Sequence, residues 1–203
     1  MRIQLDTLSP NQTYHLLTQT VIPRPIAWVL SENEDESLNL APFSFFNAMC
    51  SEPPLMALSI GRKDKETPKD TAKNILSGRE FILHIASLES SLALNDTAAT
   101  LEYQSSEIDH ADIELADFEG AKLPRVAECP VAFQCSLYEH HMVGPNEQIF
   151  VYAQAHSVYL RDEIVSEDGK RLSIDASKIN PLSRLGAAEY SSIGKPFKII
   201  RPK

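Results

Sequence analysis

The chain has 203 residues, a length that fits one domain over residues 1–203 with a buried core. Hydrophobic residues make up 43% and charged residues 23%, an ordinary globular mixture, and no apolar stretch approaches the roughly 20 residues of a membrane span. The net charge of −9 argues against a nucleic-acid partner, and the N-terminus lacks a basic-then-apolar leader, so we expect a cytoplasmic protein with no membrane partner.

The first half of the chain predicts a helix, then strands, then a second helix. Ser9-Pro10 is typical of a helix start, and the amphipathic stretch that follows extends to Thr18. Asp70 is expected to cap a short helix that Gly78 closes. Strands are expected over residues 26–30, 39–42, 55–60 and 80–86.

The second half is expected to be helical and acidic over residues 87–117 and then to return to strands. Ser87 is placed to cap a helix over 88–95, and Ser105 or Ser106 to cap a later turn. Further strands are expected over residues 131–138, 148–160 and 197–200. Several short strands with a few inserted helices predict a β-barrel decorated by helices, not alternating βαβ units.

The residue types that most often carry catalysis or metals form no recognisable site. The 3 cysteines have no C-x-x-C spacing, and Cys129 and Cys135 are expected to be buried as small hydrophobes. His84 alternates within a strand and is expected to be structural. Adjacent His140 and His141 would point to opposite faces of a strand, so we expect no metal site there. A G-x-S-x-G elbow is missing, which gives a hydrolase triad no support.

A basic turn before a predicted helix is the candidate for holding an anion. The chain has 7 glycines and neither G-x-G-x-x-G nor G-x-x-x-x-G-K-[ST], which makes a Rossmann domain or a P-loop unlikely. Arg62, Lys63, Lys65 and Lys69 instead precede a helix whose first turn contains Thr71, and a helix N-terminus favours negative charge. The alternative is a solvated loop in which neighbouring Asp and Glu side chains cancel the charge.

The segment SFFNAMC over residues 44–50 is the candidate for contacting a flat ring. A flavin ring needs an apolar wall and hydrogen bonds aimed at its pyrimidine edge. Phe45 and Phe46 can form such a wall and Asn47 can serve the edge. The alternative is that the aromatic pair belongs to the core.

Five segments in register carry a family resemblance: VIPRPIAWV, NLAPFSFFN, SEPPL, KDTAKNI and, near the end, RLGAAEY. In this order and at these spacings the chain resembles the flavin reductase-like, FMN-binding split-barrel family, and within it the flavoredoxin-type branch. The resemblance implies a six-stranded antiparallel split barrel with flanking helices. It also implies a homodimer with FMN bound near the subunit interface.

The resemblance implies positions for FMN as well. Residues 47–50 would border the ring and residues 69–71 would close on the phosphate. Ser59, Gly61 and Arg62 would follow the ribityl chain and phosphate. The turn from Arg62 to Lys69 lacks the glycine usual in the family, so side chains are expected to replace backbone contacts. Tyr190 is expected to line the substrate side of the ring, the alternative being a packed C-terminal tyrosine. The expected cofactor-binding residues are Asn47, Ala48, Met49, Cys50, Ser59, Gly61, Arg62, Lys69, Asp70 and Thr71.

The function implied by the resemblance is an FMN-binding oxidoreductase. One form is an NAD(P)H-dependent flavin reductase with hydride transfer to flavin N5, in which the protein positions the rings, so no catalytic residue is assigned. The alternative is a flavoredoxin-like electron carrier that holds FMN tightly and is reduced by a partner protein. A third form keeps the fold as a binding module without turnover.

Overall fold

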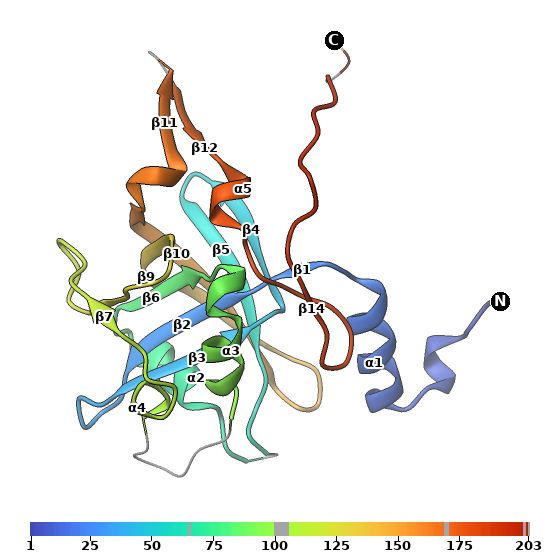
Figure 1. The fold of residues 1–203 in the computed structure, drawn as a ribbon. Coiled ribbons are helices and arrows are strands. Elements are labelled where there is room, and N and C mark those ends of the chain that lie inside the picture. Colours follow the sequence, from blue (N-terminus) through green and yellow to red (C-terminus); the bar gives the residue numbers. More distant parts are fainter. Residues whose placement is uncertain (65, 100–105, 169–170, 201, 203) are drawn as a thin grey trace.

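The computed structural model describes residues 1–64, 66–99, 106–168, 171–200 and 202, and an antiparallel sheet forms its centre (Figure 1). Within these residues the sheet has seven strands in the order β3-β2-β6-β9-β10-β5-β4. Their bounds are β2 Ala27–Glu32, β3 Leu38–Phe43, β4 Phe46–Ser51, β5 Pro54–Ile60, β6 Phe81–Ile85, β9 Val131–Val143 and β10 Gln148–Leu160. The expected count of six strands is therefore corrected to seven in the sheet.

The one strand of this seven-stranded sheet that the sequence analysis did not predict is β4, which forms from the segment expected to wall a ring. It pairs with β5 through the register Phe46↔Leu58 and Ser51↔Pro54. Its side chains are mostly exposed, so the hydrophobic alternation that marks a half-buried strand is not present.

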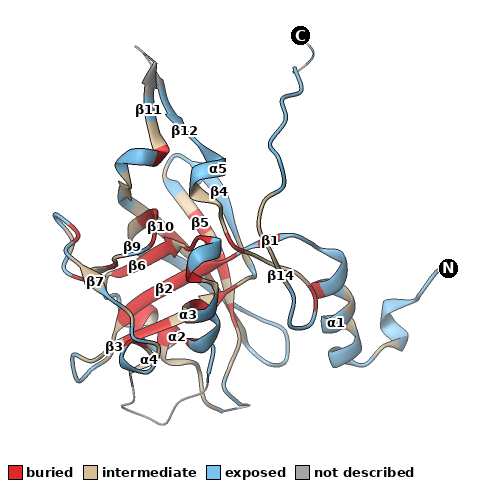
Figure 2. Ribbon diagram, in the orientation of Figure 1, coloured by how far each residue is buried: buried red, intermediate tan, exposed pale blue. Residues whose placement is uncertain are grey.

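Side chains are buried on both faces of the sheet, and Figure 2 shows this burial running along β2 and β6. One cluster contains Val29, Leu58 and Val151 and is joined by Ile75 of α2 (Asp70–Leu76). On the other face, the indole Nε1 of fully buried Trp28 donates to Thr97 Oγ1 at 2.9 Å. The apolar run at 26–30 is thus continuous because its strand is covered on both faces.

Most helices are short and cover the sheet or flank it. α1 begins as the sequence predicts, because Ser9 Oγ accepts from Gln12 N at 3.3 Å and Gln12 Oε1 accepts from Ser9 N at 2.9 Å. The other helical elements are η1 Leu5–Thr7, η2 Leu88–Ser90, α3 Ser91–Asp96, α4 Glu107–His110, η3 Asp162–Ile164 and α5 Ala176–Ile179, with α1 at Pro10–Thr20. Among the described residues, none of these is long and apolar enough to span a bilayer.

Three expected helix caps differ in outcome. Asp70 is the first residue of α2, and Lys69 occupies the cap position without a side-chain cap bond, which corrects the prediction for Asp70. Ser87 precedes η2 and makes no capping hydrogen bond. Ser106 Oγ accepts from Ile108 N at 3.2 Å and caps α4 as predicted. Lys65 and Ser105 lie outside the described residues.

Three small sheets complete the fold, and one of them joins the two ends of the chain. β1 (Arg24–Pro25) pairs with β13 (Ser183–Arg184), which pairs with β14 (Tyr190–Ser191), so the segment after α1 lies beside the C-terminal loop (Figure 1). The others pair β7 (Leu115–Ala116) with β8 (Arg125–Val126) and β11 (Val165–Asp168) with β12 (Arg171–Ile174). The predicted strand over 197–200 is wrong: these residues run without a ladder partner, and Phe197 is 83% exposed.

Candidate functional site

The turn between β5 and α2, residues 61–69, forms the candidate phosphate site and is called the cationic turn below. A β-bridge between Arg62 and Pro68 closes it. One Arg62 guanidinium nitrogen donates to Glu147 Oε2 at 3.1 Å and another to the Glu66 carbonyl at 2.7 Å. The third, Nε, is buried and has no hydrogen-bond partner among the described residues. An orphaned guanidinium donor is a group that a phosphate oxygen would satisfy.

Lys69 adds a cation that has no anionic partner among the described residues. Its Nζ lies 5.5 Å from the centre of the Phe43 ring, and no ion pair with it is formed by the residues that the structure describes. Burial, together with the charge of Lys63, lowers the pKa of Lys69. Partial dehydration strengthens any charge-assisted bond that this ammonium makes.

Asp70 beside it is already neutralised. Its carboxylate lies 2.5 Å from Lys63 Nζ and 3.3 Å from Lys73 Nζ. Burial alone would raise the pKa of Asp70, but the hydrogen bonds and charges of the two lysines outweigh it and the pKa is lowered. The carboxylate therefore leaves the charge of Lys69 uncompensated.

Thr71 lies in a buried polar network that the sequence reasoning missed. Its Oγ1 accepts from Asn39 Nδ2 at 2.9 Å, Asn39 also donates to Ser31 Oγ at 3.3 Å, and Asn74 donates to the same oxygen at 3.0 Å. The network fixes α2 against β2 and β3. The sequence signal that could have indicated this network is a polar residue inside each of two apolar strands, Ser31 in β2 and Asn39 in β3. The contact of Thr71 with a phosphate stays a prediction.

The four predicted ring contacts are all exposed on β4, the outermost strand of the sheet: Asn47, Ala48, Met49 and Cys50. Asn47 Oδ1 accepts from the next backbone N–H at 2.9 Å. The aromatic pair before them divides, since Phe46 packs against the core and Phe45 is 39% exposed, 6.2 Å from the Tyr14 ring. An outermost strand leaves backbone groups on its free edge for a ligand to pair with.

The end of β5 connects these two parts. Ser59 N donates to the Phe45 carbonyl at 2.8 Å, and Ser59 Oγ accepts from Gln148 Nε2 at 2.8 Å. A β-carbon built on Gly61 would lie 3.8 Å from Gln148 Oε1, an ordinary contact. Ser59, which is bonded to Phe45 in the ring candidate, is thus only three residues from Arg62 in the cationic turn.

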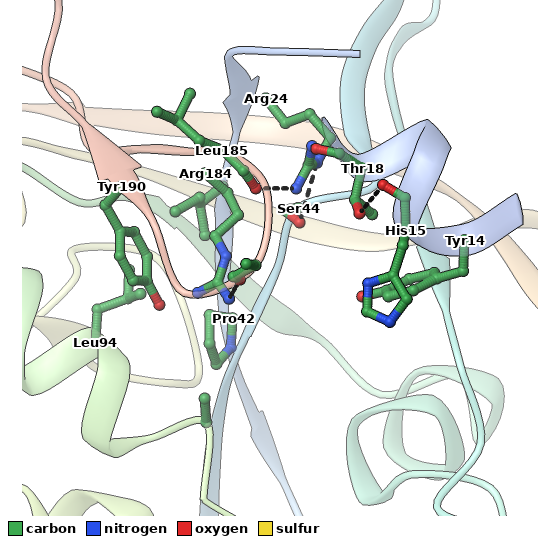
Figure 3. Close-up of a pocket in the computed structure, with 13 residues that line it drawn as sticks. Tyr14, His15, Thr18, Arg24, Pro42, Ser44, Leu94, Arg184, Leu185 and Tyr190 are labelled. Carbon is green, nitrogen blue, oxygen red and sulfur yellow. Dashed lines mark hydrogen bonds between the residues drawn. The ribbon is translucent and has the colours of Figure 1, made fainter. Parts of the chain in front are cut away.

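Tyr190 lies apart from these residues. It lines a pocket of about 190 Å³ between α1, α3 and the C-terminal loop, and none of the ten predicted cofactor residues is among the lining residues (Figure 3). Its hydroxyl donates to Asn95 Oδ1 at 3.0 Å, and its ring packs against the core. The role of Tyr190 on the substrate side of a flavin stays a prediction.

His84 is structural, as predicted. It is fully buried, its Nε2 accepts from Val126 N at 3.0 Å, and its Nδ1, which therefore carries the proton, lies 2.9 Å from the Trp28 carbonyl. Burial lowers its pKa to about 4, despite the hydrogen bond to the Trp28 carbonyl. The imidazole is neutral and unavailable to a substrate.

Of the other cysteine and histidine side chains considered in the sequence analysis, three are either buried or paired with a neighbouring side chain. Cys129 and Cys135 are buried, and burial raises the pKa of each thiol to about 12. His141 Nε2 lies 3.2 Å from Glu139 Oε1. Over the described ranges no group of three or more His, Cys, Asp or Glu residues is arranged to hold a metal ion.

Comparison with known proteins places the chain in a family. Residues 19–173 match the model of the flavin reductase like domain. The chain is 34% identical to the uncharacterised protein YwrF of Bacillus subtilis, over 98% of each. Nitrilotriacetate monooxygenase component B from Bacillus cereus is 30% identical, with a TM-score of 0.90 over 98% of each chain. The 2-nitrobenzoate 2-nitroreductase NbaA of Pseudomonas fluorescens is 27% identical, with a TM-score of 0.88 over 100% of this chain and 96% of that one.

The fold likeness extends further. Flavoredoxin of Desulfovibrio vulgaris is 19% identical, with a TM-score of 0.72 over 98% of this chain and 97% of that one, and shares the fold. A protein with a split barrel domain from Shewanella frigidimarina is 20% identical, with a TM-score of 0.85 over 100% of each chain. The family model covers well over half of the chain, and the solved structures cover nearly all of it. The chain therefore belongs to the flavin reductase-like family of split-barrel proteins.

Proposed function

We propose that the protein is an FMN-binding oxidoreductase that reduces flavin with NAD(P)H. The observation that carries the proposal is full-length similarity, at 30% identity and a TM-score of 0.90, to a monooxygenase component. Similarity of 27% to a nitroreductase points to the same class of redox chemistry.

The cationic turn fits the phosphate of FMN. In the described part of the chain, the buried Nε of Arg62 has no hydrogen-bond partner, although the guanidinium pairs with Glu147, and the partly buried ammonium of Lys69 has no anionic partner. A dianionic phosphate would satisfy both, and the network around Thr71 holds α2 in place beside them. We assign Arg62 and Lys69 as its main side-chain ligands.

The free edge of β4 fits the polar edge of a flavin ring. Backbone N–H and C=O groups of an edge strand alternate along it without strand partners, which supplies donors and acceptors in the pattern a pyrimidine edge requires. Asn47 and Met49 occupy this strand, and Phe45 adds an exposed aromatic face just before it. FMN, when bound, would supply the hydride chemistry, and these residues would position its ring.

The test is an absorbance spectrum of the purified protein, followed by anaerobic additions of NADH and of NADPH. We expect flavin bands that survive desalting and that one nucleotide bleaches rapidly. Bound flavin that neither nucleotide bleaches, but that a protein donor reduces, would replace the reductase with an electron carrier. A colourless protein that does not bind added FMN would refute the cofactor itself.

The phosphate assignment has its own test. Lys69→Ala should weaken FMN binding at least tenfold in a fluorescence titration, because a hydrogen bond to a charged group is worth about 1.5–3 kcal/mol and tenfold is about 1.4 kcal/mol. Lys122→Ala is the matched control, since it removes the same charge from an exposed position. Equal affinity of the two variants would remove Lys69 from the site.

We also propose that two copies of the chain associate. Large apolar side chains are exposed on one face of the β9–β10 hairpin near its turn, where Val143 is 52% and Phe150 37% exposed. Burying such a patch is favourable, at about 25 cal/mol per Å². Light scattering should give the mass of a dimer, and Phe150→Glu should shift it toward the monomer. A monomeric wild-type protein would contradict this.

A further inference from the structure

The pocket between α1 and the C-terminal loop is lined by two arginines and by no described acidic residue. Residues from both ends of the chain surround it: Tyr14 and His15 of α1, Arg24 of β1, and Arg184 and Tyr190 of the C-terminal loop (Figure 3). We propose that this pocket binds a small aromatic carboxylate, a single ring bearing one carboxyl group. The inference does not depend on flavin binding, because the cationic turn and β4 contribute no lining residue.

The charge is the first argument. Arg24 and Arg184 are directly opposite each other on paired strands β1 and β13, an arrangement of like charges that destabilises a sheet. The thirteen residues described around the pocket include no Asp or Glu. Burial lowers the pKa of Arg24; Tyr14 acts in the opposite direction, and the charge of Arg184 adds a smaller lowering. Two guanidinium groups that face one pocket without a counter-ion create a positive potential that an anion would relieve.

The two arginines differ in their hydrogen bonds: Arg24 is fixed by its acceptors, whereas Arg184 keeps donors available for a ligand. Arg24 is 7% exposed and donates to three neutral carbonyls, of Thr18, of Val21 at 3.0 Å and of Leu185 at 2.7 Å. These bonds hold its charge in place without cancelling it. Arg24 is therefore a positioning residue that keeps the pocket positive.

Arg184 has donors to spare. One N–H donates to the Ala187 carbonyl at 2.5 Å, and the guanidinium stacks on the Tyr190 ring at 4.4 Å from its centre. In the described part of the chain its other donors have no partner. A planar guanidinium held by stacking presents its remaining N–H groups in the fork that pairs with a carboxylate. Arg184 is the direct ligand.

The volume and the apolar lining of the pocket indicate that the carboxylate is attached to a single aromatic ring. The pocket has a volume of about 190 Å³. A cavity of about 150 Å³ lined by apolar side chains holds one benzene molecule, so the pocket has room for one ring with a carboxyl group. Ile26, Pro42 and Leu94 supply apolar contacts for the ring. Tyr14 supplies an aromatic contact opposite Tyr190 (Figure 3).

The test on the unaltered protein is calorimetric titration with benzoate, retaining whatever flavin the protein carries. Benzamide has the same shape without the charge, and acetate has the charge without the ring. We expect saturable benzoate binding at one site, with both comparison compounds at least tenfold weaker. Benzamide binding as tightly as benzoate, or no saturable benzoate binding up to about 10 mM, tenfold above a millimolar Kd, would overturn the proposal.

Two variants that each remove one positive charge distinguish a direct contact with benzoate from the electrostatic effect of the protein's net charge. Arg184→Gln should weaken benzoate binding at least tenfold, whereas Arg2→Gln, at an exposed N-terminal position, should leave it within twofold. Equal weakening by both variants, or none by Arg184→Gln, would overturn the assignment. Because the wild-type comparison of benzoate with benzamide needs no variant, it decides the matter if Arg184→Gln does not fold.

Competition experiments distinguish a carboxylate site from a site for phosphate or for a nucleotide. Inorganic phosphate and NADP⁺ are added separately to protein half-saturated with benzoate. We expect neither to displace it at concentrations equal to that of benzoate. Displacement by phosphate would show a phosphate site and displacement by NADP⁺ a nucleotide site, and either would overturn the aromatic carboxylate.

Discussion

The buried His84 makes the stability of the fold depend on pH in a calculable way. In the native protein both ring nitrogens are hydrogen-bonded and the side chain is fully buried, so its pKa falls to about 4. In the unfolded chain the imidazole returns to its ordinary pKa of 6.5. Between these values the unfolded state binds a proton that the native state excludes, so acid favours unfolding.

The size of the effect follows from the difference between the two pKa values. The contribution of His84 to stability is complete above pH 6.5 and is lost as the pH falls through the window down to about 4. One proton changes the free energy of unfolding by about 1.4 kcal/mol per pH unit, which gives about 3 kcal/mol over the window. A loss of that size is a large share of the 5–15 kcal/mol typical of a domain.

Urea denaturation at several pH values between about 7.5 and about 4.5 measures this loss. His84→Gln removes the titrating group, so its free energy of unfolding should fall less steeply than that of the wild type. His110→Gln, at an exposed position of α4, is the control and should keep the wild-type slope. Parallel curves for wild type and His84→Gln would refute the reasoning. Nuclear magnetic resonance of the His84 ring should also show no protonation down to about pH 5.

Three further outcomes are expected. Gly186→Ala should destabilise the protein by about 1–3 kcal/mol in urea, because a β-carbon there would clash with the Gln19 side chain and lie 3.2 Å from its Cα; unchanged stability would contradict that contact. Asn47→Ala should shift the spectrum or potential of bound flavin while stability stays within about 0.5 kcal/mol, and a collapse in stability would make Asn47 structural. A thiol reagent should modify Cys50 alone in the native protein, and rapid modification of a second cysteine would contradict the burial of the others.

Elements with strong local signals were predictable. α1 begins at its Ser9-Pro10 signal, and β10 has the predicted bounds, because a cap and a long apolar run are written in neighbouring residues. β4 was not predictable, since its exposed side chains leave its pairing with β5 as its only mark. The apolar segment 197–200 shows the converse error: β-propensity does not make a strand where no partner strand is available.

The candidate site divides in the same way. The basic residues of the cationic turn are adjacent in sequence, and their position before α2 was predictable. The partners of these residues were not predictable, because Glu147 reaches the cationic turn from the β9–β10 turn and Phe43 from the end of β3. The pocket was not predictable from the sequence, because Arg24 and Arg184 come together only through the pairing of two short strands that are far apart in the chain.

The carbonyl bonds of Arg24 also set an order of events during synthesis. Its guanidinium leaves the ribosome early, but Leu185, one of its acceptors, lies 161 residues further along the chain. A buried cation lacking an acceptor is costly, so the region after α1 completes its packing only after Leu185 has emerged. Nascent chains halted before Leu185 should therefore remain open to proteases near Arg24, because the segment that fixes this arginine is made 161 residues later.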